Sequence, residues 1–115
     1  MNKNKDLIIK KIFSLATKHH ASNNIEVAQN LYKEVLKINP NYAPALNNLG
    51  VVFKIIGENQ KAKDCYEKAI EIDPSNADAY CNLGMIFKIL EKNQQAIDCY
   101  EQAIKINPKH INAYN

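Results

Sequence analysis

The chain has 115 residues, the length of a single domain, and 46% of them are hydrophobic. No run approaches the roughly 20 consecutive apolar residues of a membrane-spanning helix, and Lys10 and Lys11 interrupt the N-terminal apolar stretch, so we expect neither a membrane partner nor a targeting segment. The net charge is +3 and the chain contains no arginine, the residue best suited to phosphates and guanine edges, so nucleic acid is not expected as a partner.

A sequence pattern with a period of 34 residues runs through the chain. A degenerate copy occupies residues 9–42, and two close copies with 19 identities in 34 positions occupy residues 43–76 and 77–110. Residues 111–115 match the opening of a fourth copy, as in the N-terminal piece of a longer array. A fixed period of this size indicates stacked supersecondary units, so we predict one repeat array over residues 1–115.

Each copy is predicted to form two helices, because apolar residues recur at three- and four-residue spacing in both halves. In the degenerate first copy, the residues in register with the pattern are Ile12, Leu15, Ala16, Ala28, Tyr32, Val35 and Pro40. In the third copy, the residues predicted to be buried are Tyr80, Leu83, Gly84, Phe87, Ala96, Tyr100, Ala103 and Ile104.

The bend between the two halves of each copy is predicted from turn-forming residues. Asn23 and Gly57 occupy this bend in the first two copies, where a positive φ is tolerated. Glu91 takes the place in the third copy, so its turn must be made differently or at an energetic cost. Asn59 and Asn93 are predicted to cap the second helix of their copies.

A proline marks the end of the second helix in every copy. The three stop signals are Asn39-Pro40, Asp73-Pro74 and Asn107-Pro108. Proline lacks the N–H that would continue a helix, and it disfavours helical backbone in the residue before it, so each second helix should end there.

Candidate catalytic or metal-binding side chains are few. Cys65, Cys81 and Cys99 form no C-x-x-C pair, which indicates free thiols in a cytoplasmic protein rather than disulfides or a zinc site. His19 is expected to be partly buried and His20 to lie on the surface. The sequence shows no set of nucleophile and base, no phosphate loop and no paired acids. We therefore expect no catalytic residue, metal or cofactor, and no enzymatic activity from this chain by itself.

A set of residues in the second and third copies resembles the tetratricopeptide repeat. The set comprises Leu46, Leu49, Gly50, Phe53, Ala62, Tyr66, Ala69 and Pro74, with Tyr80, Leu83, Gly84, Phe87, Ala96, Tyr100, Ala103 and Pro108 one period later. The resemblance implies an all-α solenoid of antiparallel helix pairs in a right-handed superhelix, with three repeats and the start of a fourth. It also implies that the first helix of each pair lines a concave face and that the chain is a non-catalytic protein-interaction module.

Helix geometry then assigns residues of each first helix to the concave face, because Leu49, Gly50 and Phe53 turn into the stack. The residues expected there are Asn47, Asn48, Val51, Lys54 and Ile55 in the second copy, Asp78, Cys81, Asn82, Met85, Lys88 and Ile89 in the third, and Lys10, Phe13, Ser14, Thr17 and His20 in the first. This mixture of amides, apolar groups and cations suits an extended peptide whose backbone needs hydrogen-bond partners.

Asn48 and Asn82 are the leading candidates for peptide contact. An amide both donates and accepts, so a ladder of amides can hold a peptide backbone without reading its side chains. In tetratricopeptide families that bind peptides, including the arrays of O-linked N-acetylglucosamine transferases, asparagines at this place contact the ligand backbone. The alternative is that both asparagines serve only the packing of the repeat or bond within their own helix.

Lys54 and Lys88 could attract an acidic segment or a C-terminal carboxylate, or could simply be solvated lysines near a helix end. Chaperone-binding members of the family clamp a carboxylate with two lysines, two asparagines and an arginine, and only Asn48 matches that set. Phe13, Thr17, Asp78 and Asn82 stand at the other four positions. The carboxylate clamp is therefore not expected.

Three hypotheses for function follow. The first is a peptide-binding module in which Asn48 and Asn82 hold the backbone and Val51, Met85, Lys54 and Lys88 select side chains. The second is the substrate-recognition arm of a larger glycosyltransferase-like or sulfotransferase-like enzyme. The third is a scaffold that self-associates head to tail, through an apolar edge at the C-terminal repeat formed by Ile97, Tyr100 and Ile104.

Overall fold

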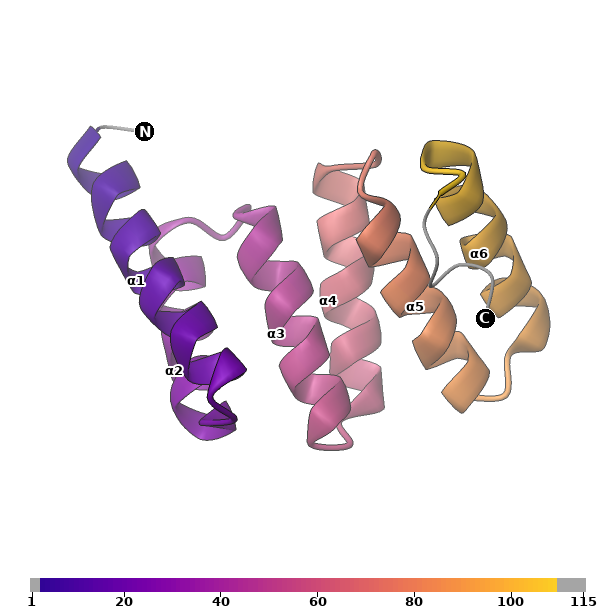
Figure 1. The fold of residues 1–115 in the computed structure, drawn as a ribbon, viewed down its shortest axis with the longest axis horizontal. Helices are drawn as coiled ribbons and strands as arrows, with labels where there is room; N and C mark the ends of the chain where they lie inside the picture. The colour runs from indigo at the N-terminus through magenta and orange to yellow at the C-terminus, as the bar shows by residue number, and fades with distance from the viewer. Residues whose placement is uncertain (1–2, 110–115) are drawn as a thin grey trace.

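The computed structural model describes residues 3–109, and this part of the chain folds into six α-helices without strands (Figure 1). The helices are α1 (Lys3–Ala21), α2 (Ile25–Ile38), α3 (Ala43–Ile55), α4 (Asn59–Ile72), α5 (Ala77–Ile89) and α6 (Asn93–Ile106). Consecutive helices pair as α1 with α2, α3 with α4 and α5 with α6, and the pairs stack along the long axis of 42 Å. The prediction of an all-α solenoid of helix pairs is confirmed. The expected opening of a fourth copy, residues 111–115, lies outside the described residues.

At Gly50 the two helices of the second pair come close together. A Cβ atom at this position would lie 2.5 Å from Cε1 of Tyr66, whose side chain is fully buried. In the third pair, a Cβ atom at Gly84 would likewise lie 2.7 Å from Cε1 of Tyr100. Both glycines therefore serve close helix packing, as their place in the repeat predicted. In the first pair Ala16 takes the equivalent position and is completely buried.

The turn inside each pair uses one residue with left-handed backbone. The φ angles are 64° at Asn23, 83° at Gly57 and 61° at Glu91. In each turn the N–H three residues beyond the helix donates to a carbonyl in its last turn, as from Glu58 to Phe53 at 2.8 Å, which is the bonding of a Schellman motif. Glu91 makes the same turn as Gly57. Holding a residue other than glycine in this left-handed backbone conformation costs about 1 kcal/mol.

The predicted caps at Asn59 and Asn93 are wrong. These asparagines are the first residues of α4 and α6, and the residues before them are Glu58 and Lys92, whose side chains make no capping hydrogen bond. The reason is the short turn: only one residue separates the left-handed residue from the next helix. The asparagines therefore fall one position too late to cap.

The three second helices end at Ile38, Ile72 and Ile106, directly before the Asx-Pro pairs, as predicted. The residue before each proline also accepts a hydrogen bond through its side chain, which was not predicted from the sequence. The side-chain oxygens of Asn39, Asp73 and Asn107 each accept a hydrogen bond from the backbone N–H two residues later, at 3.0, 3.2 and 3.2 Å. These Asx turns direct the chain from one pair into the next.

The first pair is less enclosed than the others. Leu15 is 47% exposed, whereas Leu49 and Leu83, at the same position of the next two repeats, are 5% and 6% exposed. The reason is that α2 packs against α3 and α4 packs against α5, while no described helix lies on the outer side of α1 (Figure 1). Within residues 3–109, no helix combines the length and the apolar character that crossing a membrane requires.

Candidate functional site

The candidate contact residues lie on the first helices of the second and third pairs. We call this set the amide surface; it comprises Asn47, Asn48, Val51 and Lys54 on α3 and Asn82, Met85 and Lys88 on α5. Lys88 is exposed, and the other six side chains are half-buried. Half-burial is expected of side chains that line a contact surface, because they are held by neighbours on one side and open to solvent on the other.

Two contacts between α3 and α5 tie the amide surface together. The Nδ2 group of Asn82 donates a hydrogen bond to Oδ1 of Asn47 at 3.3 Å. Nearby, Nζ of Lys54 lies 3.9 Å from Sδ of Met85. The sequence placed all four residues on this face but did not foresee that they would pair across neighbouring repeats. Asn82 thus bonds to the adjacent first helix and not within its own.

Asn48 has a different partner, although it occupies the same repeat position as Asn82. Its side-chain amide interacts with the hydroxyl of Tyr32 on α2, and this tyrosine is fully buried. Burial raises the pKa of Tyr32, and the bond with Asn48 opposes that shift. The same hydroxyl lies 2.9 Å from Nδ1 of His20 on α1. A polar chain of three side chains therefore joins α1, α2 and α3.

This polar chain corrects the expectation that His20 lies on the surface. The imidazole is half-buried, and its ring centroid is 5.9 Å from that of Tyr32 in an edge-on arrangement. The adjacent His19 is also half-buried, with Nδ1 3.2 Å from Nδ2 of Asn24 in the turn after α1. His20 lies against the tyrosine because the last turn of α1 packs on α2.

The second junction lacks such a chain. Tyr66 occupies the position of Tyr32 one repeat later, and its hydroxyl is buried without any hydrogen-bond partner in the described part of the molecule. Burial raises the pKa of Tyr66 well above its ordinary value. The residues equivalent to His20 and Asn48 are Lys54 and Asn82, and both are engaged elsewhere on the amide surface.

The cysteines offer no reactive group. Cys81, expected on the concave face, is 1% exposed and packs with Ala77 and Ala103 between α5 and α6, so that expectation is wrong. The small thiol fits the tight contact between these helices. Burial raises the pKa of Cys65 and of Cys99 to about 11, and the neighbouring carboxylates add to the shift. These two thiols are protonated at neutral pH and are poor nucleophiles.

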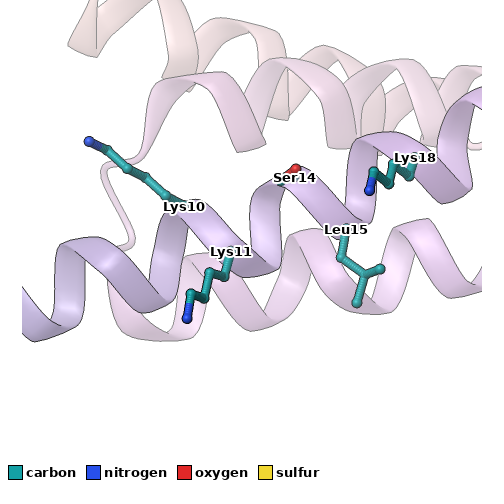
Figure 2. A pocket seen from close by; sticks show the side chains of 5 residues that line it. All are labelled: Lys10, Lys11, Ser14, Leu15 and Lys18. Atoms are coloured by element: carbon teal, nitrogen blue, oxygen red, sulfur yellow. The ribbon is translucent and has the colours of Figure 1, made fainter.

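A hollow on the outside of α1 is lined by Lys10, Lys11, Ser14, Leu15 and Lys18 (Figure 2). Helix α1 carries five lysines and one aspartate. Its net positive charge is therefore larger than that of the whole chain, which is +3. Figure 2 shows the ammonium groups of Lys10 and Lys11 pointing to opposite sides of the helix. The charges therefore make α1 electropositive without converging on one ligand atom.

Metal ligation has no support in residues 3–109, where no group of three or more histidine, cysteine, aspartate or glutamate side chains is placed to hold an ion. The chemistry available on the amide surface is hydrogen bonding by amides, apolar contact and attraction by ammonium groups.

Comparison with known families gives a direct match. The model of the tetratricopeptide repeat matches residues 43–76 and 77–110, which together make up more than half of the chain. A comparison with the sequences of functionally curated proteins gives no significant match.

Several solved structures share the fold. A crystal structure of MamA superimposes with a TM-score of 0.87 at 28% identity, over 92% of this chain and 62% of that one. A mutant O-GlcNAc transferase from Thermobaculum terrenum gives 0.94 at 24% identity, over 99% of this chain and 22% of the transferase. The first tetratricopeptide domain of Spaghetti, bound to the HSP90 peptide SRMEEVD, gives 0.90 at 18% identity, over 100% of this chain and 89% of that one. The chain thus spans less than two thirds of the first two of these proteins.

Proposed function

Because the chain belongs to the tetratricopeptide repeat family, whose members are generally non-catalytic protein-interaction modules, we propose that residues 1–115 form one array that binds an extended peptide across the amide surface. The observation that carries the proposal is the amide pair of Asn82 and Asn47, which bridges two neighbouring repeats at 3.3 Å where both side chains remain partly open to solvent. In support, a chain of this fold, the first domain of Spaghetti, has been solved with a peptide bound.

Each kind of residue on the amide surface has a separate role in the proposal. The asparagines supply donors and acceptors to the peptide backbone. Val51 and Met85 offer apolar contact to a side chain of the peptide. Lys54 and Lys88 attract an acidic residue, and the excess of lysine on α1 extends that preference toward the N-terminal pair. The expected ligand is therefore an extended segment with apolar and acidic side chains.

The experiment is selection of peptides from a random display library on residues 1–115, followed by calorimetry with the double variant Asn48→Ala/Asn82→Ala. Each removed hydrogen bond is worth about 0.5–1.5 kcal/mol, so we expect the affinity to fall about tenfold to a hundredfold. The matched control is Asn30→Ala/Asn93→Ala, which removes two exposed asparagines from second helices. The control should bind within about twofold of the native chain.

Unchanged affinity in the Asn48→Ala/Asn82→Ala variant, with its helix content and thermal midpoint preserved, would contradict the assignment of the amide surface. An equal loss in the control variant would point to the second helices as the binding face.

A second candidate is that this array is the recognition arm of a larger enzyme of the glycosyltransferase or sulfotransferase kind. The likeness to the Thermobaculum terrenum transferase favours it, since the fold of this chain matches 22% of that protein with a TM-score of 0.94. The array would still act by binding a peptide, and its substrate would be the bound protein. The coding sequence downstream of Asn115 decides between an arm and a separate module.

Self-association is a third candidate, favoured by apolar side chains at both ends of the stack. Ile97 on α6 is 49% exposed and Leu15 on α1 is 47% exposed. Contact between unlike ends gives an open, head-to-tail assembly, so light scattering should show a mass that rises with concentration. Ile97→Glu should shift that rise to higher concentration, because burying an unpaired charge in the contact is unfavourable. A strict monomer at millimolar concentration would contradict the idea.

A further inference from the structure

The junction between α2 and α3 and the junction between α4 and α5 have equivalent residues but different polar contacts. In the first, the buried hydroxyl of Tyr32 lies 2.9 Å from Nδ1 of His20 and interacts with the side-chain amide of Asn48. In the second, the buried hydroxyl of Tyr66 has no partner in the described residues. The difference arises on the amide surface, where Asn82 has turned toward Asn47.

A buried hydroxyl without a partner is rare in folded proteins and raises the free energy of the state that contains it. Asn82 is the residue that repeat equivalence places beside Tyr66, as Asn48 is placed beside Tyr32. The other candidate, the Lys54 side chain, reaches Met85 instead. Asn82 therefore has two competing partners, Asn47 on α3 and Tyr66 on α4, and in the unliganded protein it bonds to Asn47.

We propose that Asn82 is a ligand-responsive side chain that leaves Asn47 and bonds to the Tyr66 hydroxyl when a peptide binds. The inference rests on the proposed function. In the unliganded state Asn82 Nδ2–H donates to Asn47 Oδ1. In the bound state a backbone N–H of the peptide takes over that acceptor, and the amide of Asn82 holds Tyr66 as Asn48 already holds Tyr32.

The two asparagines of the repeat thereby differ in the free protein and become equivalent in the complex. Asn48 is held in place by Tyr32 before any ligand arrives, so its remaining amide atoms face the peptide in a fixed orientation. Asn82 reaches that arrangement only with the peptide, and the newly satisfied Tyr66 hydroxyl contributes to affinity although it never touches the ligand. Tyr66 is thus a positioning residue.

The test compares Tyr32→Phe with Tyr66→Phe, two variants that each remove one buried hydroxyl. Without peptide, Tyr32→Phe breaks existing hydrogen bonds and should lower the midpoint of thermal unfolding. Tyr66→Phe removes an unpartnered group and should leave the midpoint equal or higher. With a peptide recovered by display as the probe, Tyr66→Phe should bind about three- to tenfold more weakly than the native chain, although without peptide it is at least as stable.

The outcomes separate this inference from the proposed function. If Tyr66→Phe lowers the midpoint as much as Tyr32→Phe, or binds the selected peptide with native affinity, the inference is overturned while peptide binding stands. If no selected peptide depends on the amide surface, the proposed function fails and the inference fails with it. Full support requires that Tyr66→Phe loses affinity without losing stability, whereas Tyr32→Phe loses stability in the absence of peptide.

Discussion

Tyr66→Ala is expected to lower the free energy of unfolding by about 3–5 kcal/mol, the range for removing a large buried aromatic side chain. The Tyr66 ring is 0% exposed and fills the space against Gly50 between α3 and α4. Its hydroxyl has no partner in the described residues, so the loss comes from packing and from the cavity left behind. Urea unfolding followed by circular dichroism measures it.

The matched control is Tyr100→Ala, which removes the equivalent ring from the third pair. Tyr100 is only half-buried, so its removal should cost clearly less than that of Tyr66. Equal losses at the two sites, or a loss below about 1 kcal/mol at Tyr66, would contradict the packing described here.

Gly50→Ala is expected to destabilise the array by about 1–3 kcal/mol, the usual cost of overpacking a closed core. Alanine favours a helix over glycine by about 1 kcal/mol, so without a steric obstacle the substitution would stabilise α3. The obstacle is the Tyr66 ring: three of its atoms would lie 2.5 to 2.9 Å from the new methyl carbon. A fully buried ring has no free space into which to move.

A double-mutant cycle makes this prediction specific. In a Tyr66→Ala background the obstacle is absent, so Gly50→Ala should reverse its sign and stabilise the chain by about 1 kcal/mol. Gly84→Ala provides a milder comparison, because it faces the half-buried Tyr100 at 2.7 Å and that ring can shift outward. Urea unfolding of the four variants measures the coupling. A stabilising Gly50→Ala in the native background would show that the helices do not approach closely.

The fold was predictable because the residues that recur in the repeat are those that pack the helices together or end them. Small residues such as Gly50 recur where helices touch, and Asx-Pro pairs recur where the second helices end, so a period of 34 residues predicts both helices and their pairing. The same periodicity placed the seven residues of the amide surface on α3 and α5. Their role in binding remains a prediction.

The helix caps and the position of Cys81 could not be predicted from the 34-residue period. The caps assigned to Asn59 and Asn93 were wrong because only one residue separates the left-handed residue of each turn from the helix, so both asparagines are already helical. Cys81 was wrongly placed on the concave face because helical spacing alone does not separate the edge of that face from the tight contact between α5 and α6.

The side-chain partners were not predictable from the repeat for a different reason. Asn82 contacts Asn47, which is 35 residues away, and Lys54 contacts Met85, which is 31 residues away, so neither pair follows the period of 34. The polar chain from His20 through Tyr32 also has no counterpart one repeat later, because Lys54 replaces the imidazole and Asn82 bonds to Asn47. Equivalent positions therefore carry different interactions.

The most direct test of peptide binding on the first helices is nuclear magnetic resonance of the chain titrated with a display-selected peptide, observing the side-chain amide groups. The proposed function predicts that the largest shifts occur at the Nδ2 groups of Asn47, Asn48 and Asn82, with small changes at Asn30 on α2 and Asn93 on α6. Large shifts on α2, α4 or α6, with the three asparagines of the amide surface unmoved, would contradict it.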